Sequence, residues 1–161
     1  MKTLIVYYSL EGNTKFIAEM AAKKLGADML CLEPETPYPT KGIAKFFVGG
    51  KSSTFGEAPA LKPYSVKVNA YDQIVLGTPV WAGKFAPPLR TFFNEHSFKG
   101  KRVAFFANSS SGNAVKCFET FAQAASGNTV VDTLSLVDPL RRGDKAKIEE
   151  KVNAFCEKLS K

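Results

Sequence analysis

The chain has 161 residues, of which 45% are hydrophobic, and it carries a formal net charge of +7. This length supplies enough apolar material for one well-formed core and too little for two ordinary domains, so we expect a single domain over residues 1–161. The apolar run within residues 1–8 is too short for a signal peptide, and no stretch reaches membrane-spanning length. We therefore expect a cytoplasmic protein without membrane insertion.

Five short apolar segments, rich in β-branched or aromatic residues, alternate with four segments of helical spacing. The strands are predicted at residues 3–8, 29–32, 73–77, 103–107 and 129–137, and the helices at 13–25, 87–96, 114–125 and 145–159. This alternation predicts an α/β fold with a doubly wound, five-stranded parallel sheet and helices on both faces. The last strand alternates apolar and polar residues, which places it at an edge of the sheet.

The first loop of interest follows the first predicted strand and leads directly into a helix. It consists of Ser9, Leu10, Glu11, Gly12, Asn13 and Thr14. A loop at this position directs backbone N–H groups and the positive end of a helix toward one point, which suits a phosphate. In the alternative interpretation, Asn13 or Thr14 only caps the helix and Gly12 only turns the chain.

The second loop follows the third predicted strand and contains the single tryptophan of the chain. It consists of Thr78, Pro79, Val80, Trp81, Ala82 and Gly83. We expect Pro79 to stop the strand, and the small residues after Trp81 leave open space beside its ring, where a planar ligand can lie. The alternative is a tryptophan buried in the core.

The third loop follows the fourth predicted strand and is made of small polar residues. Its candidate binding residues are Asn108, Ser109, Ser110, Ser111 and Gly112. A turn followed by a helix cap is the alternative interpretation. Because the carboxyl ends of parallel strands share one edge of the sheet, we expect all three loops to converge on one crevice.

The three loops together resemble those of short-chain flavodoxins. The similarity extends over nearly the whole chain, and it is specific in the first two loops and loose in the third. It implies a sheet in the order 2-1-3-4-5, FMN as the cofactor, and the transfer of one or two electrons. By the same resemblance, the residues of the first loop hold the FMN phosphate, those of the second border the isoalloxazine ring, and those of the third cover its polar edge.

Two features depart from the pattern of that family. Many relatives have Thr or Ser where this chain has Glu11, and we expect its carboxylate to point outward and only its backbone N–H to serve the phosphate. Flavodoxins of the familiar type are acidic, whereas ten basic and three acidic residues between Thr40 and Arg102 account for the whole net charge here. We expect redox partner proteins with acidic docking faces, and Lys84 is a candidate for stabilising negative charge on the reduced flavin.

The connection at residues 34–64 is unusually long for a compact domain. It contains Phe46, Phe47 and Phe55 among lysines. We predict that it forms a lid or docking surface over the crevice. Packing of these rings onto the sheet edge is the alternative.

Several other features of the sequence narrow the function. The three cysteines, Cys31, Cys117 and Cys156, are widely spaced, so we expect small buried hydrophobic side chains and no metal site. His96 is predicted to be a surface or capping residue, and no acid/base constellation is visible, which favours an electron carrier over an enzyme. A reductase that uses a nicotinamide or a quinone is the alternative. A basic phosphate- or nucleic-acid-binding module without flavin is the alternative of a different class, although no nucleic-acid motif is present.

Overall fold

The computed structural model describes residues 1–40 and 56–161. Its parallel sheet has the order β2-β1-β3-β5-β6, which is the predicted 2-1-3-4-5 arrangement. The strands are β1 (Thr3–Tyr7), β2 (Asp28–Cys31), β3 (Gln73–Trp81), β5 (Arg102–Ser109) and β6 (Thr129–Val137), and a two-residue strand β4 (Lys84–Phe85) pairs with β3 alone. The predicted position of β6 at an edge is confirmed.

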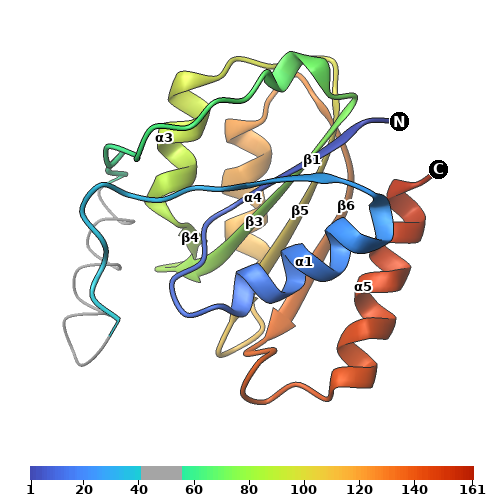
Figure 1. Cartoon of the computed structure of the whole chain (residues 1–161). Helices are drawn as coiled ribbons and strands as arrows, with labels where there is room; N and C mark the ends of the chain where they lie inside the picture. The colour runs from blue at the N-terminus through green and yellow to red at the C-terminus, as the bar shows by residue number, and fades with distance from the viewer. Residues whose placement is uncertain (41–55) are drawn as a thin grey trace.

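Helices cover both faces of the sheet. Helices α1 (Asn13–Leu25) and α5 (Lys145–Leu159) lie on one face, and α3 (Pro87–Glu95) and α4 (Val115–Ala124) lie on the other (Figure 1). A short 3₁₀ turn, η1 (Val68–Ala70), precedes β3. Each predicted helix is therefore present, with ends that differ from the predicted ones by at most one residue.

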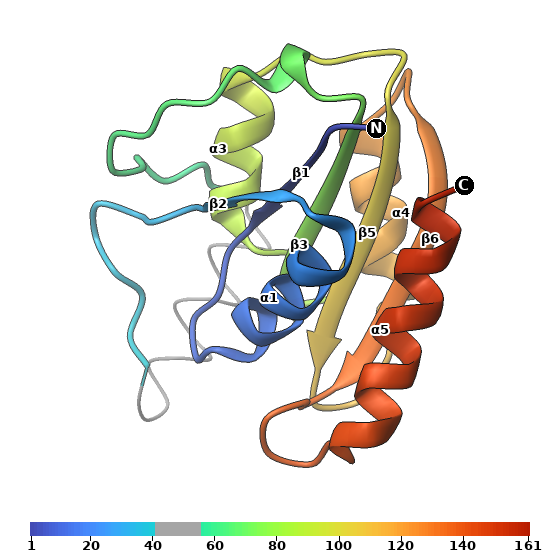
Figure 2. The ribbon, with the colours of Figure 1, turned by 45° about the vertical axis from the view of Figure 1, so that its right-hand side comes forward.

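The alternation of side chains along the strands produces two apolar cores. Leu4 and Val6 of β1 belong to the core under α3 and α4, whereas Ile5 and Tyr7 belong to the core under α1 and α5. Both faces of the central strands are therefore buried, as nearly continuous apolar strands require. Figure 2 shows the sheet between its two helical layers.

A glycine allows close packing at the centre of the sheet. Gly77 in β3 pairs with Phe106 in β5, and a Cβ atom at Gly77 would lie only 2.0 Å from the ring of Phe106. The Phe106 ring is fully buried, so a side chain at position 77 would clash with it. The ring of Phe106 thus fills the space beside β3 on the face covered by α1 and α5.

The prediction that Pro79 stops the third strand is wrong. Strand β3 continues through Pro79 to Trp81 and then turns back as β4. Pairing between β1 and β3 ends at Gly77, so one side of β3 is an edge beyond that residue. A proline without an N–H is tolerated at such an edge, because no ladder bond is lost there.

The long connection after β2 leaves and returns along antiparallel segments. Glu35 N donates to the Ala60 carbonyl over 2.9 Å, and Lys62 N donates to the Glu33 carbonyl over 2.8 Å. The predicted lid residues Phe46, Phe47 and Phe55 lie outside the described residues. The described part of the connection nevertheless reaches the site described below, through Tyr38.

The expectation that all three cysteines are buried is wrong for one of them. Cys117 and Cys156 are buried, whereas Cys31 is exposed, because it lies on the edge strand β2.

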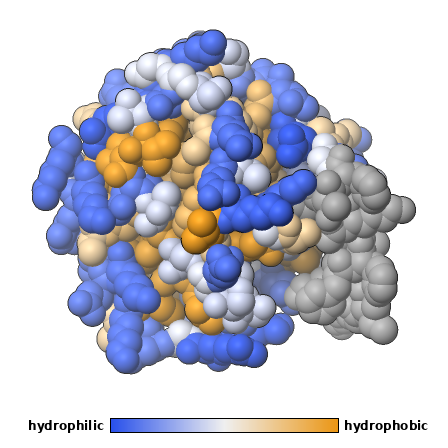
Figure 3. Space-filling model, turned by 180° about the vertical axis from the view of Figure 1, so that it is seen from behind, coloured by the Kyte–Doolittle hydropathy of each residue, from blue (hydrophilic) through white to orange (hydrophobic). Residues whose placement is uncertain are grey.

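No helix in the described ranges combines the length and hydrophobicity that crossing a bilayer requires. On the face opposite to that of Figure 1, hydrophobic patches are interrupted by hydrophilic side chains (Figure 3).

Candidate functional site

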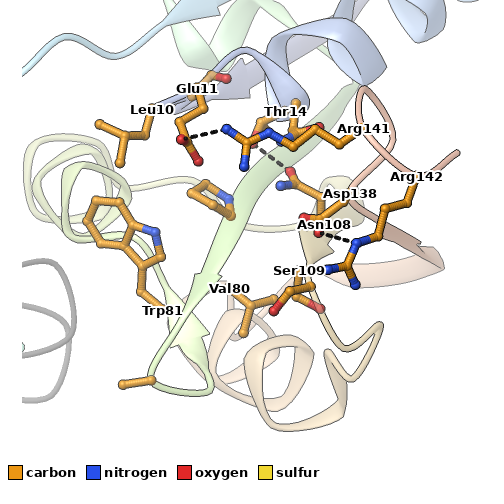
Figure 4. Close-up of a pocket in the computed structure, with 15 residues that line it drawn as sticks. Leu10, Glu11, Thr14, Val80, Trp81, Asn108, Ser109, Asp138, Arg141 and Arg142 are labelled. Carbon is orange, nitrogen blue, oxygen red and sulfur yellow. Dashed lines mark hydrogen bonds and ion pairs between the residues drawn. The ribbon is translucent and has the colours of Figure 1, made fainter. Parts of the chain in front are cut away.

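A pocket of about 360 Å³ opens at the carboxyl ends of β1, β3, β5 and β6. Such an edge is where doubly wound sheets bind their ligands. The pocket is lined by Ser9, Leu10, Glu11, Asn13, Thr14, Pro79, Val80, Trp81, Ala82, Asn108, Ser109, Ser110, Asp138, Arg141 and Arg142. All three predicted loops therefore meet in one place (Figure 4).

The first loop turns at Gly12, which is the N-cap residue of α1. Its φ of 93° lies in the left-handed region, and no side chain caps the helix from this position. Ser9 accepts a hydrogen bond from Lys15 N through Oγ over 3.1 Å and so satisfies one amide of the first turn. The hydroxyl proton of Ser9 is then left for another acceptor.

Asn13 and Thr14 connect the first loop to two other parts of the pocket wall. Asn13 Oδ1 accepts from Leu140 N over 3.0 Å, and Thr14 Oγ1 donates to Asn108 Oδ1 over 2.7 Å. The helix-cap alternative for these two side chains is therefore wrong. The hydroxyl proton of Thr14 is used in the bond to Asn108, whereas the side-chain amide of Asn13 still has two N–H donors that a ligand can accept from.

Trp81 stands on the side of the pocket opposite the arginines (Figure 4). Two tyrosines meet its ring edge-on, Tyr8 at a centroid distance of 5.6 Å and Tyr38 at 5.0 Å. Trp81 is half-buried and lines the pocket, which does not fit the core alternative. Nothing in the sequence places Tyr38 in the site, because it lies in the long connection after β2, far in sequence from Trp81.

The turn after Trp81 has two residues with positive φ, Ala82 at 48° and Gly83 at 73°. This pair of angles is typical of the type I′ turn, whose twist matches that of a hairpin. Ala82 lines the pocket and Gly83 does not. Thr78 is also outside the lining: its buried hydroxyl accepts from Ala86 N and donates to the Pro79 carbonyl, both over 2.8 Å.

The third loop contributes only its first part to the pocket. Asn108, Ser109 and Ser110 line it, whereas Ser111 and Gly112 do not. Ser109 accepts a hydrogen bond from Gly112 N through Oγ over 2.8 Å, which closes the loop on itself. Five of the predicted site residues therefore do not line the pocket: Gly12, Thr78, Gly83, Ser111 and Gly112.

A fourth loop, after β6, was not predicted from the sequence. Asp138, Arg141 and Arg142 of this loop line the pocket. The backbone is fixed at Asp138, whose N–H donates to the Ser109 carbonyl and whose carbonyl accepts from the N–H groups of both arginines. The signal was available, because this loop follows the carboxyl end of another parallel strand.

The charged side chains of this wall form ion pairs. Arg141 Nη2 lies 3.4 Å from Glu11 Oε1, and Arg142 Nε lies 3.6 Å from Asp138 Oδ2 (Figure 4). The prediction that the carboxylate of Glu11 points outward is therefore wrong, since it lines the pocket and joins two loops. Lys84 lies on β4 and is not among the lining residues, whose positively charged members are Arg141 and Arg142.

Among the described residues, Tyr8 and His96 are two candidates for proton transfer. Burial raises the pKa of Tyr8 above its usual range, so its hydroxyl stays neutral. His96 lies one residue beyond α3, where Tyr64 Oη contacts its Nε2 over 2.9 Å, and it does not line the pocket. Its predicted placement at the end of a helix is confirmed.

A family model described as flavodoxin matches residues 2–152. The chain belongs to the flavodoxin family. The sheet order and the three loops at its carboxyl edge agree with this assignment.

Several solved structures are similar to this chain over almost its full length. A flavoprotein of Lactobacillus acidophilus in complex with FMN is 24% identical, covers 93% of this chain and 97% of its own, and has a TM-score of 0.73. A protein of Bacteroides eggerthii is 23% identical over 99% of this chain and 98% of its own, with a TM-score of 0.78. Flavodoxin 2 of Bacillus cereus, solved in the oxidised state, is 20% identical over 99% and 98%, with a TM-score of 0.60. At these identities the likeness concerns the fold.

Proposed function

We propose that this chain is an FMN-binding electron-transfer protein. The pocket at the carboxyl edge of the sheet carries the proposal, because it joins an anion-binding helix start to an aromatic wall. FMN is the cofactor that membership of the flavodoxin family implies, and it is bound in the Lactobacillus relative. When bound, FMN supplies the electron chemistry, and the protein supplies binding, orientation and tuning.

The donors at the start of α1 fit the phosphate of FMN. Ser9 keeps its hydroxyl proton and Asn13 keeps both amide protons, since their oxygens accept from backbone N–H groups. The positive end of α1 adds to the attraction for an anion. In this assignment Leu10, Glu11 and Gly12 contribute through the backbone, and Thr14 holds Asn108 in place.

The remaining lining fits the flavin ring. Trp81 presents an aromatic surface that Tyr8 and Tyr38 hold edge-on, and Val80 adds an apolar contact. Asn108, Ser109 and Ser110 offer polar atoms at the carboxyl end of β5. The volume of about 360 Å³ lies within the range of small-molecule pockets, which runs from roughly 300 to 1,000 Å³.

A carrier fits the site better than a self-contained reductase. Among the described lining residues, the ionisable side chains are Glu11, Asp138, Arg141 and Arg142, and each is held in an ion pair. The described part of the lining contains no histidine, cysteine or tyrosine that could transfer a proton. The partners that we propose are redox proteins with acidic docking faces, which the basic balance of residues 40–102 would attract.

Stopped-flow mixing of the FMN-loaded protein with NADH, NADPH or a quinone tests this function. We expect slow direct reaction with all three and rapid, salt-sensitive exchange with an acidic redox protein. Rapid reduction by a nicotinamide or turnover of a quinone would instead assign the protein as a reductase. Purified protein that refuses FMN would remove both assignments.

A further inference from the structure

We propose that exposed side chains around the mouth of the pocket form a docking surface for an acidic redox protein. This inference rests on the proposed function, because docking here would bring a second redox centre close to the flavin. It names the place of contact, which the charge of residues 40–102 alone does not. The surface, called the rim below, consists of Val115, Lys116, Val137, Leu140, Arg141 and Arg142.

Two apolar side chains of the rim lie against glycines of the predicted loops. A Cβ atom at Gly12 would lie 3.3 Å from Leu140 Cδ1. A Cβ atom at Gly112 would lie 2.8 Å from Val137 Cγ2. Leu140 therefore covers the start of α1, and Val137 covers the loop after β5. Both side chains are nevertheless exposed to solvent.

Lys116 has the same kind of position at the third loop. In the turn after Trp81, a Cβ atom at Gly83 would lie 3.3 Å from Lys116 Cδ, so the aliphatic part of the lysine covers this turn. Lys116 is exposed in the first turn of α4. Lysines commonly pack their methylene groups in this way and keep the ammonium group in water. The rim thus touches all three predicted loops that border the pocket.

Exposed apolar side chains gather at this edge of the molecule. In the described part of the chain, six large apolar side chains are exposed. Three of them, Val115, Val137 and Leu140, lie at or after the carboxyl ends of β5 and β6, and the other three lie near the starts of strands. Apolar side chains grouped beside charged ones are typical of interaction sites. A group this small suits a transient electron-transfer contact.

The charge of the rim favours an acidic partner. The loops after β5 and β6 and the first turns of the helices that follow them, residues 110–118 and 138–148, contain five basic and two acidic residues. Asp144 caps α5 by accepting from two backbone N–H groups. Asp138 pairs with Arg142, and its side chain is 21% exposed, whereas that of Arg142 is 67% exposed.

The second ion pair of the pocket wall has the same asymmetry. The side chain of Arg141 is 70% exposed, and that of Glu11 is 27% exposed (Figure 4). In both pairs the cation is therefore the part that an approaching protein meets first. A face of Asp and Glu side chains is complementary to such a surface, and it speeds association through electrostatic attraction.

The probe for this surface is an acidic plant-type [2Fe–2S] ferredoxin, whose low potential makes its reduced form an electron donor. One electron leaves the cluster, which is oxidised, and enters the flavin, which is reduced. Stopped-flow mixing with the FMN-loaded protein gives the second-order rate constant. Binding without electron transfer is measured by titrating the isotope-labelled, FMN-loaded protein with oxidised ferredoxin and following its amide NMR signals. We expect the amides of the rim to shift or broaden.

Two valines of β6 provide a matched pair of variants. Val137 and Val130 lie at opposite ends of this strand, and their exposures are 42% and 44%. Val137→Ser should lower the rate constant and the affinity for ferredoxin about threefold, because an apolar contact is lost. Val130→Ser should leave both within about 1.5-fold of the wild type, because position 130 is far from the pocket.

Two lysines provide the second matched pair. Lys99 also lies against a glycine, since a Cβ atom at Gly127 would lie 3.4 Å from Lys99 Cδ, but it belongs to the amino edge of the sheet. Lys116→Gln should lower the rate constant about threefold, and Lys99→Gln should change it less than about 1.5-fold. Added salt should shrink the effect of Lys116→Gln and leave that of Val137→Ser, because only the former removes a charge.

FMN affinity separates docking from a structural role. Gly112 N donates to Ser109 Oγ and the Gly112 carbonyl accepts from Ser135 Oγ, each over 2.8 Å, so this loop is held without the side chain of Val137. Val137 and Lys116 do not line the pocket. All four variants should therefore bind FMN within about twofold of the wild type.

Four results would overturn the inference while leaving the proposed function intact. The first is an FMN-loaded wild type that does not bind the ferredoxin, and the second is a set of NMR changes confined to the amino edge of the sheet. The third is an equal effect of the rim variants and their controls. The fourth is a parallel loss of FMN affinity in the rim variants. Failure of the wild type to bind FMN would instead overturn the proposed function, and the inference with it.

Discussion

Thr14 Oγ1 donates a hydrogen bond to Asn108 Oδ1 over 2.7 Å, although the two residues lie 94 positions apart in the chain. Both side chains are buried. The bond connects the start of α1 to the carboxyl end of β5, and so it fixes the loop at residues 9–14 against the polar loop of the pocket. Thr14, which the sequence predicts to hold the phosphate, therefore also links two walls of the site.

Replacing Thr14 with Val should lower the free energy of unfolding by about 1–3 kcal/mol, because Asn108 Oδ1 would remain buried without its donor. Thr14→Ser keeps the hydroxyl and should lose clearly less. Urea unfolding followed by the fluorescence of Trp81 measures both. Equal losses in the two variants would show that the methyl group of Thr14 matters and the hydrogen bond does not.

Asn13 allows anchoring and ligand binding to be separated. An aspartate at this position can still accept from Leu140 N, and its charge suits the first turn of α1. We expect Asn13→Asp to keep the free energy of unfolding within about 0.5 kcal/mol of the wild type. FMN affinity should fall, because two amide donors are exchanged for a negative charge, whereas riboflavin affinity should not. Unchanged binding of FMN would remove Asn13 from the phosphate site.

The turn at Ala82 and Gly83 stores backbone strain beside Trp81. A left-handed conformation costs a non-glycine residue roughly 1–2 kcal/mol, and Ala82 adopts it with φ of 48°. Ala82→Asn should raise the free energy of unfolding by about 0.5–1 kcal/mol, since Asn-Gly is the preferred pair in a type I′ turn. Gly83→Ala should lower it by about 1 kcal/mol. The opposite order in urea unfolding would contradict this turn geometry.

The buried thiols predict how stability depends on alkaline pH. Burial raises the pKa of Cys117 to about 12 and is the main reason that the pKa of Cys156 is raised to about 11, from an ordinary value of 9.0. Because the folded pKa exceeds the unfolded one, this contribution to stability is complete below pH 9 and is lost as the pH rises through 11 to 12.

Unfolding in reducing buffer should therefore show a steeper loss of stability above pH 9 in the wild type than in Cys117→Ala. The variant is less stable at every pH, because it leaves a small cavity in the core. The quantity compared is the slope of the free energy of unfolding against pH. The tyrosines contribute equally to this slope in both proteins and cancel in the difference. Parallel curves would show that the Cys117 thiol is not titrated on unfolding.

The amino-acid sequence predicts the architecture well because its signals are local. Hydrophobic strands and helical spacing fix the elements, and short connections between them leave few possible topologies. The rule that ligands bind at the carboxyl ends of strands then brings the Gly12, Trp81 and Asn108 loops together. In the structure all three border one pocket.

The parts that were missed depend on contacts between distant residues. Pro79 breaks a strand by local rules, yet β3 continues because β1 no longer pairs beside it. The ring of Tyr38 reaches Trp81 from a connection without regular spacing. The outward orientation expected of Glu11 failed because its partner, Arg141, lies 130 positions away.

Titration of the flavin-free protein with FMN, followed through the fluorescence of its single tryptophan, measures whether the pocket binds flavin. Because Trp81 lines the pocket, bound flavin must alter its emission. We expect saturable quenching with one FMN per chain and weaker binding of riboflavin. Unchanged Trp81 fluorescence at saturating FMN, together with salt-dependent binding to DNA, would contradict it and favour a basic phosphate-binding module.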